Sequence, residues 1–348
     1  MKAIPSSPGR SRWTIGSGAL TLAVLLLIPL AEPHGNLIRL LFGTFLWVTT
    51  SLAWNLLGGV TGQVSFGFAV FYGLGAYISA FAINAGINPY AAFLAGGLAS
   101  AVGSILVGIP AFRLRGPYFA IATIGVNEVV RIVMSNLEVT GGASGYRLLA
   151  TLRFSQAENY YTALGLAVLA FLVSWYVMRS PFGLALRAIR EDEDAAADLG
   201  VPPFLCKLAV HALAAFLTGL AGGAFARYTA YIHPDGVFAF ATSVSILLMP
   251  VIGGLGTLLG PVIGAVVYSI VQEEMVVHFP QFHLLLYGSL LIVIVLFEPR
   301  GLVAFRASYP RGLNYVVSPQ VVAEYHRRCA GLDVTFIGLG SLRELLAA

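Results

Sequence analysis

Charged and capping residues are gathered in one short stretch of the chain, residues 180–200. Ser180 and Pro181 are typical of a helix N-cap and first helical position, and Gly200 is typical of the residue that follows a helix. Two oppositely charged pairs lie four residues apart, a spacing that allows ion pairs on one helix face: Arg187 with Glu191, and Arg190 with Asp194. The spacing predicts one capped, charged helix over residues 181–200.

This predicted helix carries an acidic run, then alanines, then a glycine. The order resembles the EAA loop of ABC importer permeases, a helix that docks into a cleft of the ATP-binding subunit. The alternative is a solvated helix at the membrane interface. The residues that the resemblance implies for coupling are Arg187, Arg190, Glu191, Asp192, Glu193, Asp194, Ala195, Ala196 and Gly200.

A polar break stands at the head of an apolar run. Thr61, Gly62 and Gln63 open this run, and Ser65 and Gly67 follow them. Free backbone groups are tolerated at membrane depth only beside protein or a water-filled cavity, so these five residues are predicted to line a solute path. Helix packing is the alternative reading, because small residues follow at helical spacing: Ser65, Ala69, Gly73 and Ala76 or Ala80.

Glu128 and Arg131 lie three residues apart in another apolar run and therefore share one helix face. An isolated charge at the bilayer centre costs about 2.5 to 3.5 kcal/mol, and a mutual pair costs less. We expect them to pair. Whether the pair faces the solute or only holds helices together stays open, and the structural role is favoured.

Gly253, Gly254 and Gly256 resemble a nucleotide loop only superficially, because they sit in an apolar run and not after a soluble strand. We assign them to the candidate solute path. A P-loop also needs Gly-Lys followed by Ser or Thr, whereas Lys2 and Lys207, the only lysines, precede Ala and Leu. The chain therefore has no nucleotide site of that kind and no cofactor is expected in it; ATP would be hydrolysed by separate subunits.

Enzyme chemistry finds little support in the sequence. The only cysteines, Cys206 and Cys329, belong to no Cys/His cluster, so neither a structural metal site nor a disulfide framework is expected. No nucleophile, base and orienting group stand in a recognisable set. Single basic residues at the ends of apolar runs read as topology signals and not as a nucleic-acid surface.

The elements that must position these residues are membrane helices. Hydrophobic residues make up 58% of the 348-residue chain and charged residues only 10%, whereas soluble domains carry about 25% charge. Runs of about 20 apolar residues recur, each long enough to cross a bilayer. An all-α, polytopic fold with ten spans is predicted at about 14–31, 37–57, 64–84, 90–112, 117–135, 159–178, 206–228, 241–258, 261–279 and 284–298.

The distribution of Lys and Arg predicts the orientation. With the N-terminus inside, 15 of the 20 basic residues face the cytoplasm, as cytoplasmic loops of membrane proteins do. Both termini are therefore expected inside. The predicted organisation is a cytoplasmic N-terminus at 1–13, a transmembrane permease domain at 14–303 and a cytoplasmic tail at 304–348.

Several motifs together resemble the LivH/LivM-like family of branched-chain amino-acid ABC transporter permeases. They begin with the run from Asn55 to Gly67 and continue in order to the end of the predicted domain; the others are Arg113–Gly125, Glu128–Arg131, Thr140–Gly145, Ser180–Glu193, Gly253–Pro261 and Glu298–Leu302. Pro250 departs from the family pattern and predicts a break or a re-entrant turn before Gly253. The tail from Ala304 matches nothing known in the family.

The resemblance implies a permease subunit in the bacterial inner membrane. Its implied partners are a second homologous permease, two ATP-binding subunits, an extracytoplasmic binding protein and membrane lipid, with no nucleic acid. Branched-chain amino acids are the implied solutes, and urea or another small polar solute is the alternative. A secondary transporter or channel is a further alternative, but such carriers favour unpaired carboxylates at mid-membrane, and Glu128 has Arg131 within reach.

Overall fold

The structure, a computed structural model, describes residues 23–29, 35–149 and 155–278. The predicted spans at 14–31 and 284–298 and the segments at 1–13 and 304–348 lie wholly or partly outside these residues. Residues 23–29 are helical. The remaining helices are α2 (Asn36–Asn55), the π-helix η1 (Leu56–Val60), α3 (Phe68–Asn84), α4 (Pro89–Ala111), α5 (Pro117–Asn136), η2 (Glu138–Thr140), η3 (Gly142–Ser144), α6 (Gln156–Arg179), α7 (Pro181–Glu191), α8 (Glu193–Asp198), α9 (Pro203–Thr229), α10 (Pro234–Val237), α11 (Phe240–Gly253) and α12 (Gly260–His278).

The expected all-α class is confirmed, since the chain is mostly helical. Six helical stretches in the described residues are long and apolar enough to cross a membrane, namely α2 with η1, α4, α5, α6, α9 and α10 with α11. The shorter α3 is also apolar. Proline occupies a first-turn position in α4, α5, α7, α9 and α10, where the missing N–H is not needed for the helix.

Two predicted spans differ from the structure. The predicted span at 64–84 begins only at Phe68, because Ser65 to Gly67 form a non-helical connection. The expected break at Pro250 is wrong, since α11 continues through this residue to Gly253. The helix ends where Gly254 adopts a φ of 128°, a conformation that glycine accepts without steric cost.

Glycine contacts hold α3, α4 and α9 together at backbone distance. A Cβ atom on Gly75 of α3 would lie 2.2 Å from the carbonyl oxygen of Gly219 in α9, and one on Gly222 would lie 2.0 Å from the carbonyl oxygen of Tyr72. Between α3 and α4, Ser100 donates a hydrogen bond of 2.8 Å to the carbonyl of Phe71. Small residues and interhelical hydrogen bonds are the usual means of helix association in lipid.

The small-residue stripe of α3 takes part in this packing. Ala69, Ala76 and Ala80 are fully buried, and a Cβ atom on Gly73 would lie 2.3 Å from the ring of Phe238. The packing interpretation of the stripe is therefore supported.

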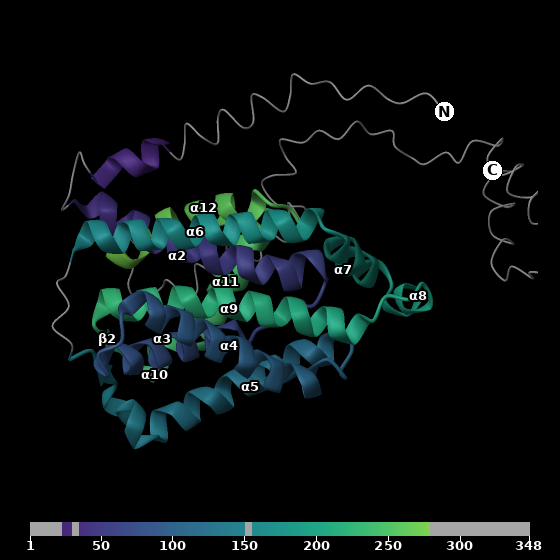
Figure 1. Ribbon diagram of the computed structural model, residues 1–348, viewed down its shortest axis with the longest axis horizontal. Coiled ribbons are helices and arrows are strands. Elements are labelled where there is room, and N and C mark those ends of the chain that lie inside the picture. The colour runs from purple at the N-terminus through teal and green to yellow at the C-terminus, as the bar shows by residue number, and fades with distance from the viewer. Residues whose placement is uncertain (1–22, 30–34, 150–154, 279–348) are drawn as a thin grey trace, which may run out of the picture. The chain divides into compact units, whose positions relative to one another are not determined.

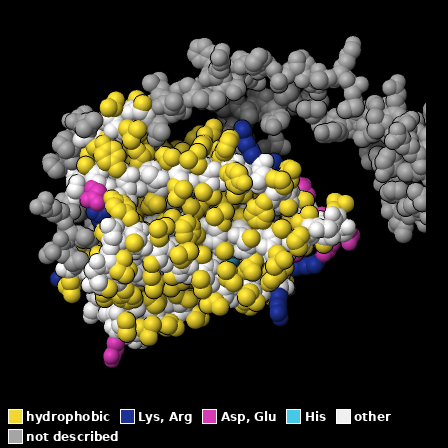
Figure 2. Space-filling view, viewed as in Figure 1, with side chains coloured by type: hydrophobic (Ala, Val, Ile, Leu, Met, Phe, Trp, Pro, Cys, Tyr) yellow, Lys and Arg dark blue, Asp and Glu magenta, His cyan; other side chains and the backbone are white. Residues whose placement is uncertain are grey.

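The two ends of the long helices carry different short elements. One end carries α7 and α8, and the other carries α10 and the short antiparallel sheet of β1 (Tyr146–Arg147) and β2 (Tyr231–Ile232), as Figure 1 shows. The flank visible in Figure 2 is covered by apolar side chains, while acidic and basic side chains lie mostly toward the two ends. This distribution suits helices that are surrounded by lipid and end in water.

Candidate functional site

The predicted cytoplasmic helix is two helices. Ser180 caps α7 by accepting a hydrogen bond of 3.2 Å from the Gly183 N–H. Asp192 has an extended backbone (φ −156°, ψ 119°), and its side chain accepts hydrogen bonds of 2.9 Å from the N–H groups of Asp194 and Ala195, which caps α8. The prediction of one helix over 181–200 is therefore wrong. Asp192 ends the first helix because its carboxylate competes for local backbone donors.

The predicted C-terminus of this segment is confirmed. Gly200 adopts a φ of +88°, and its N–H donates to the carbonyl of Ala197 at 2.9 Å. The N–H of Val201 donates to the carbonyl of Ala196 at 3.1 Å. This pair of hydrogen bonds is a Schellman motif, which satisfies the last carbonyls of α8.

Neither expected ion pair forms between the residues named for it. Arg187 donates to the carbonyl of Met178 at 2.8 Å, and Asp194 forms a bidentate pair with Arg115 at 3.0 Å. The break at Asp192 accounts for the second pair, because it removes the continuous turn on which Arg190 and Asp194 would face each other. Arg187 and Glu191 both lie in α7, and there the guanidinium binds the Met178 carbonyl instead.

A buried lysine ties α8 to the membrane helices. Lys207 of α9 is 2% exposed and donates to Glu193 at 2.7 Å. Glu193 is the first residue of α8, so the pair fixes the beginning of this short helix. Sequence reasoning placed Glu193 in the coupling set but missed Lys207, whose partner lies 14 residues earlier in the chain.

The free surface of α8 is small and partly apolar. Ala195, Ala197 and Gly200 are exposed, and Leu199 is 84% exposed. Ala196 was predicted to belong to the docking surface, but it is only 2% exposed and lies on the inner side of the helix. The predicted alanine surface is thus corrected to Ala195 and Ala197, with Leu199 added.

The polar residues at the head of α3 lie close to α7 and α5. Thr61 is buried and donates to the carbonyl of Leu56 at 2.9 Å. Gly62 has a φ of +78°, and a Cβ there would lie 3.0 Å from Cγ of Arg190. Gln63 is half-buried. These residues therefore sit at the α7 end of the helices.

Ser65 and Gly67 form the inner part of the same connection. Both are buried, and the indole N–H of Trp54 donates to the carbonyl of Ser65 at 2.8 Å. Thr123 of α5 accepts a hydrogen bond of 3.0 Å from the Phe66 N–H. The connection is thus anchored to α2 on one side and to α5 on the other.

The glycines of the loop between α11 and α12 meet the same region. Asn55 accepts a hydrogen bond of 2.9 Å from the Gly256 N–H and donates one of 2.9 Å to the carbonyl of Thr257. Gly253 is buried, and a Cβ there would lie 1.7 Å from the carbonyl oxygen of Gly260. The loop is thus bound to the end of α2, about 200 positions earlier in the chain. The two groups of predicted path residues meet at Arg190, which lies beside both Gly62 and Gly256.

Glu128 and Arg131 form the expected pair, as their side chains are joined by two hydrogen bonds. Arg131 also pairs with Asp235 of α10, a partner that the sequence did not indicate. Nearby, Asn127 donates to the carbonyl of Phe238 at 2.9 Å. The guanidinium is thus shared by two carboxylates at the end of α5 that faces away from α7.

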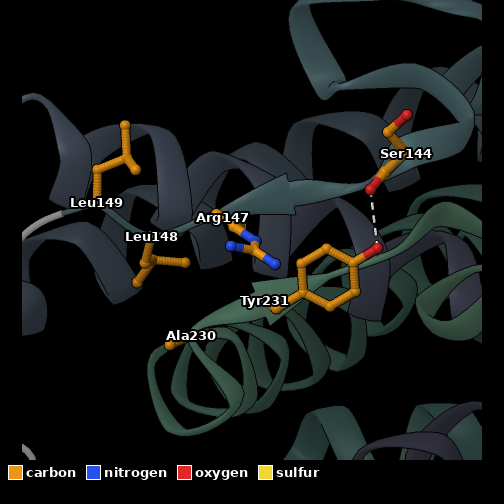
Figure 3. A pocket seen from close by; sticks show the side chains of 6 residues that line it. All are labelled: Ser144, Arg147, Leu148, Leu149, Ala230 and Tyr231. Carbon is orange, nitrogen blue, oxygen red and sulfur yellow. Dashed lines mark hydrogen bonds between the residues drawn. The ribbon is translucent and has the colours of Figure 1, made fainter.

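An open pocket of about 700 Å³ lies at that same end, where β1 meets β2. Figure 3 shows the hydroxyl of Tyr231 donating to the carbonyl of Ser144, at 2.8 Å, beside the guanidinium of Arg147. The other lining residues are Leu148, Leu149 and Ala230. The sequence did not indicate this pocket, because the two strands that form it pair across more than 80 residues.

His211 of α9 is a further buried residue that sequence reasoning missed. It is 1% exposed, and neither ring nitrogen has a hydrogen-bond partner among the described residues. The ring packs edge-on against Phe71 and Phe112 and borders a space of about 10 Å³ that Ser65 and Gly67 also line. A space of this size holds about one water molecule. A single histidine in an apolar span forms no pattern that would reveal this position.

The described residues contain no group of three His, Cys, Asp or Glu side chains that could hold a metal ion. What the described part of the chain offers is different: apolar helices of membrane-spanning length, a capped pair of short helices at one end and glycine turns next to it. These features define a multi-pass α-helical membrane protein.

Comparison with known proteins gives the family. Residues 36–295 match the family described as branched-chain amino acid transport system, permease component, and the chain belongs to this family of ABC transporter permeases. No solved structure matches the chain significantly.

Three relatives are similar along most of the chain. The high-affinity branched-chain amino acid transport system permease protein LivM of Salmonella typhimurium is 31% identical over 318 residues, covering 81% of this chain and 74% of the relative. The LivM of Escherichia coli is 31% identical over 290 residues, with 74% and 68% covered. A probable LivM of Methanocaldococcus jannaschii is 26% identical over 240 residues, with 64% and 69% covered.

Proposed function

We propose that this chain is the permease subunit of an ABC importer that moves branched-chain amino acids across the bacterial inner membrane. The named function of the bacterial relatives supports the solute class. An extracytoplasmic binding protein delivers the solute, a second homologous permease completes the channel, and two separate ATP-binding subunits supply the energy. The experiment that tests this assignment is ATP-driven uptake of labelled leucine by the reconstituted complex.

The observation that carries the proposal is the α7–α8 pair. Both helices are capped by side chains, at Ser180 and Asp192, which makes them short rigid bodies. α8 presents exposed Ala195, Ala197 and Leu199. Small side chains permit a close approach of a partner, and burying an exposed leucine against that partner removes apolar surface from water. This surface is the proposed docking site of an ATP-binding subunit.

The proposed solute path runs past the connection from Thr61 to Gly67 and the glycine loop at 253–256. Glu128 and Arg131 belong to it at the opposite end. Their side chains remain 46% and 30% exposed on a span of the membrane domain. Charged groups in spans usually face a water-filled cavity or the interior of the assembly. We therefore assign this face of α5 to the path or to the second permease, and not to lipid.

The proposed topology has ten spans with both termini inside. It is supported by the 15 to 5 division of basic residues and by the position of α7 and α8 at one end of the helices. Single cysteines placed in a variant without Cys206 and Cys329 test it. A cysteine at Asp194 should react with an impermeant reagent only after permeabilisation, whereas one at Ser144 should react in intact spheroplasts. The reverse labelling pattern contradicts the proposed orientation.

A further inference from the structure

Three segments far apart in the sequence meet beside Arg190. Its Nη1 donates a hydrogen bond of 2.6 Å to the carbonyl of Gly59, in the π-helix η1. A Cβ on Gly256, in the loop between α11 and α12, would lie 2.7 Å from the same nitrogen. We call Arg190, Gly59 and the loop residues Gly256 and Thr257 the junction. It brings a residue from the predicted coupling segment into contact with the predicted solute path.

The junction is closely packed, and its packing requires glycine at positions 59 and 256. Gly256 adopts a φ of +72°, and a Cβ there would also lie 3.0 Å from the carbonyl oxygen of Gly59. A Cβ on Gly59 would lie 2.5 Å from the backbone nitrogen of Gly256. A side chain at either position would push η1 and the loop apart. Because the two backbones are in direct contact, a displacement of one must displace the other or break the contact.

Asn55 makes the π-helix and the loop one unit. Its side chain binds the N–H of Gly256 and the carbonyl of Thr257, each at 2.9 Å. Arg190 is then the link from α7 to this unit. π-turns are uncommon and often occur at functional sites, which suits a turn that responds to a neighbouring helix.

α7 itself is well suited to carry a displacement to Arg190. Leu186 and Ile189 are almost fully buried, and a Cβ on Gly183 would lie 2.1 Å from the carbonyl oxygen of Val177 in α6. The helix therefore rests directly on the end of α6. Arg190 lies on its last turn, next to the break at Asp192 that precedes the docking surface on α8.

We propose that Arg190 is the positioning residue that transmits the movement of α7 to η1 and the 254–257 loop, at the inner end of the solute path. This inference rests on the proposed function, since it requires an ATPase docked at α8. A purely static role is the competing explanation, in which the guanidinium only neutralises the negative end of α2.

The test compares Arg190→Ala and Arg190→Lys with Arg179→Ala in the complete complex. Arg179 is the matched control, since it stacks on Trp175 of its own helix, α6. Three quantities are measured: co-purification of the ATP-binding subunits, ATP hydrolysis and uptake of labelled leucine.

Arg190→Ala should assemble and hydrolyse ATP normally but lose uptake by about tenfold or more, the factor that corresponds to one charged hydrogen bond. Lysine keeps the charge and one donor, so Arg190→Lys should recover part of the uptake. Arg179→Ala should behave as the unmodified complex does.

Normal uptake by Arg190→Ala, or parallel loss of assembly and hydrolysis, would overturn the inference, since the residue would then be dispensable or merely structural. Equal uptake by Arg190→Lys and the unmodified complex would favour the static charge and also overturn it. A failure of the proposed function is detected by different variants. If the ATP-binding subunits still assemble with a chain changed at the exposed surface of α8, the proposed docking site is wrong, whatever Arg190 does.

Discussion

Replacing Leu199 with aspartate should prevent the chain from binding its ATP-binding subunits. Leu199 is 84% exposed at the C-terminal end of α8, and burial of such a side chain at an interface is worth about 1.5 to 3 kcal/mol. Aspartate removes this gain and adds a charge that the interface must desolvate. We expect affinity to fall by about a hundredfold, measured by co-purification from detergent and by titration of the purified subunits. Uptake should be lost with it.

Ala197→Arg tests the same surface without removing the anchor. Ala197 is exposed on α8, so arginine there leaves the packing of α8 intact and blocks only close approach. Arginine at Ala196 would be a poor test because this residue is buried against the chain itself. Leu149→Asp is the matched control, as Leu149 is 80% exposed at the opposite end and should leave ATPase binding unchanged. If both α8 variants bind the ATP-binding subunits normally, α8 is not the docking site.

Gly75→Ala should destabilise the membrane domain itself. The new Cβ would lie 2.2 Å from the carbonyl oxygen of Gly219 and 2.4 Å from its Cα. Both contacts are with backbone, which cannot rotate away as a side chain does. Overpacking typically costs about 1 to 3 kcal/mol. The thermal midpoint and folded yield in detergent should both fall.

The matched control for this change is Gly165→Ala in α6. A Cβ there meets no atom within 4 Å, and alanine is favoured over glycine in a helix by about 1 kcal/mol. We expect the midpoint of this variant to stay constant or rise. If Gly75→Ala proved as stable as Gly165→Ala, α3 and α9 would not be in backbone contact in the folded protein.

Features that depend on neighbouring residues could be predicted from the sequence. The cap at Ser180, the left-handed Gly200 and the pair of Glu128 with Arg131 are all local, within a few residues of their partners. Apolar run length predicted the apolar helices of the described region for the same reason, although the start of α3 and the end of α11 were misplaced.

The break at Asp192 was not predictable in the same way. An aspartate on a charged helix serves equally well as a surface residue and as the N-cap of a new helix. Only the fold decides between these roles, through the anchoring of Glu193 by Lys207 at one side.

The remaining misses are long-range contacts. Arg190 meets the Gly59 carbonyl 131 positions away, and Asp235 joins Arg131 across 104 positions. A carbonyl acceptor has no side-chain signature, so no residue pattern could reveal the first contact. The predicted coupling segment and the predicted solute path were therefore found separately in the sequence, and only the fold brings them into contact.

ATP-dependent uptake in proteoliposomes tests the central claim most directly. The chain is reconstituted with the second permease and the ATP-binding subunits, and the binding protein and labelled leucine are added outside. We expect uptake only with hydrolysable ATP inside and only with all subunits present, and unlabelled isoleucine and valine should compete where urea does not. Leucine uptake by this chain alone, without ATP, would contradict the account and identify a channel or secondary carrier instead.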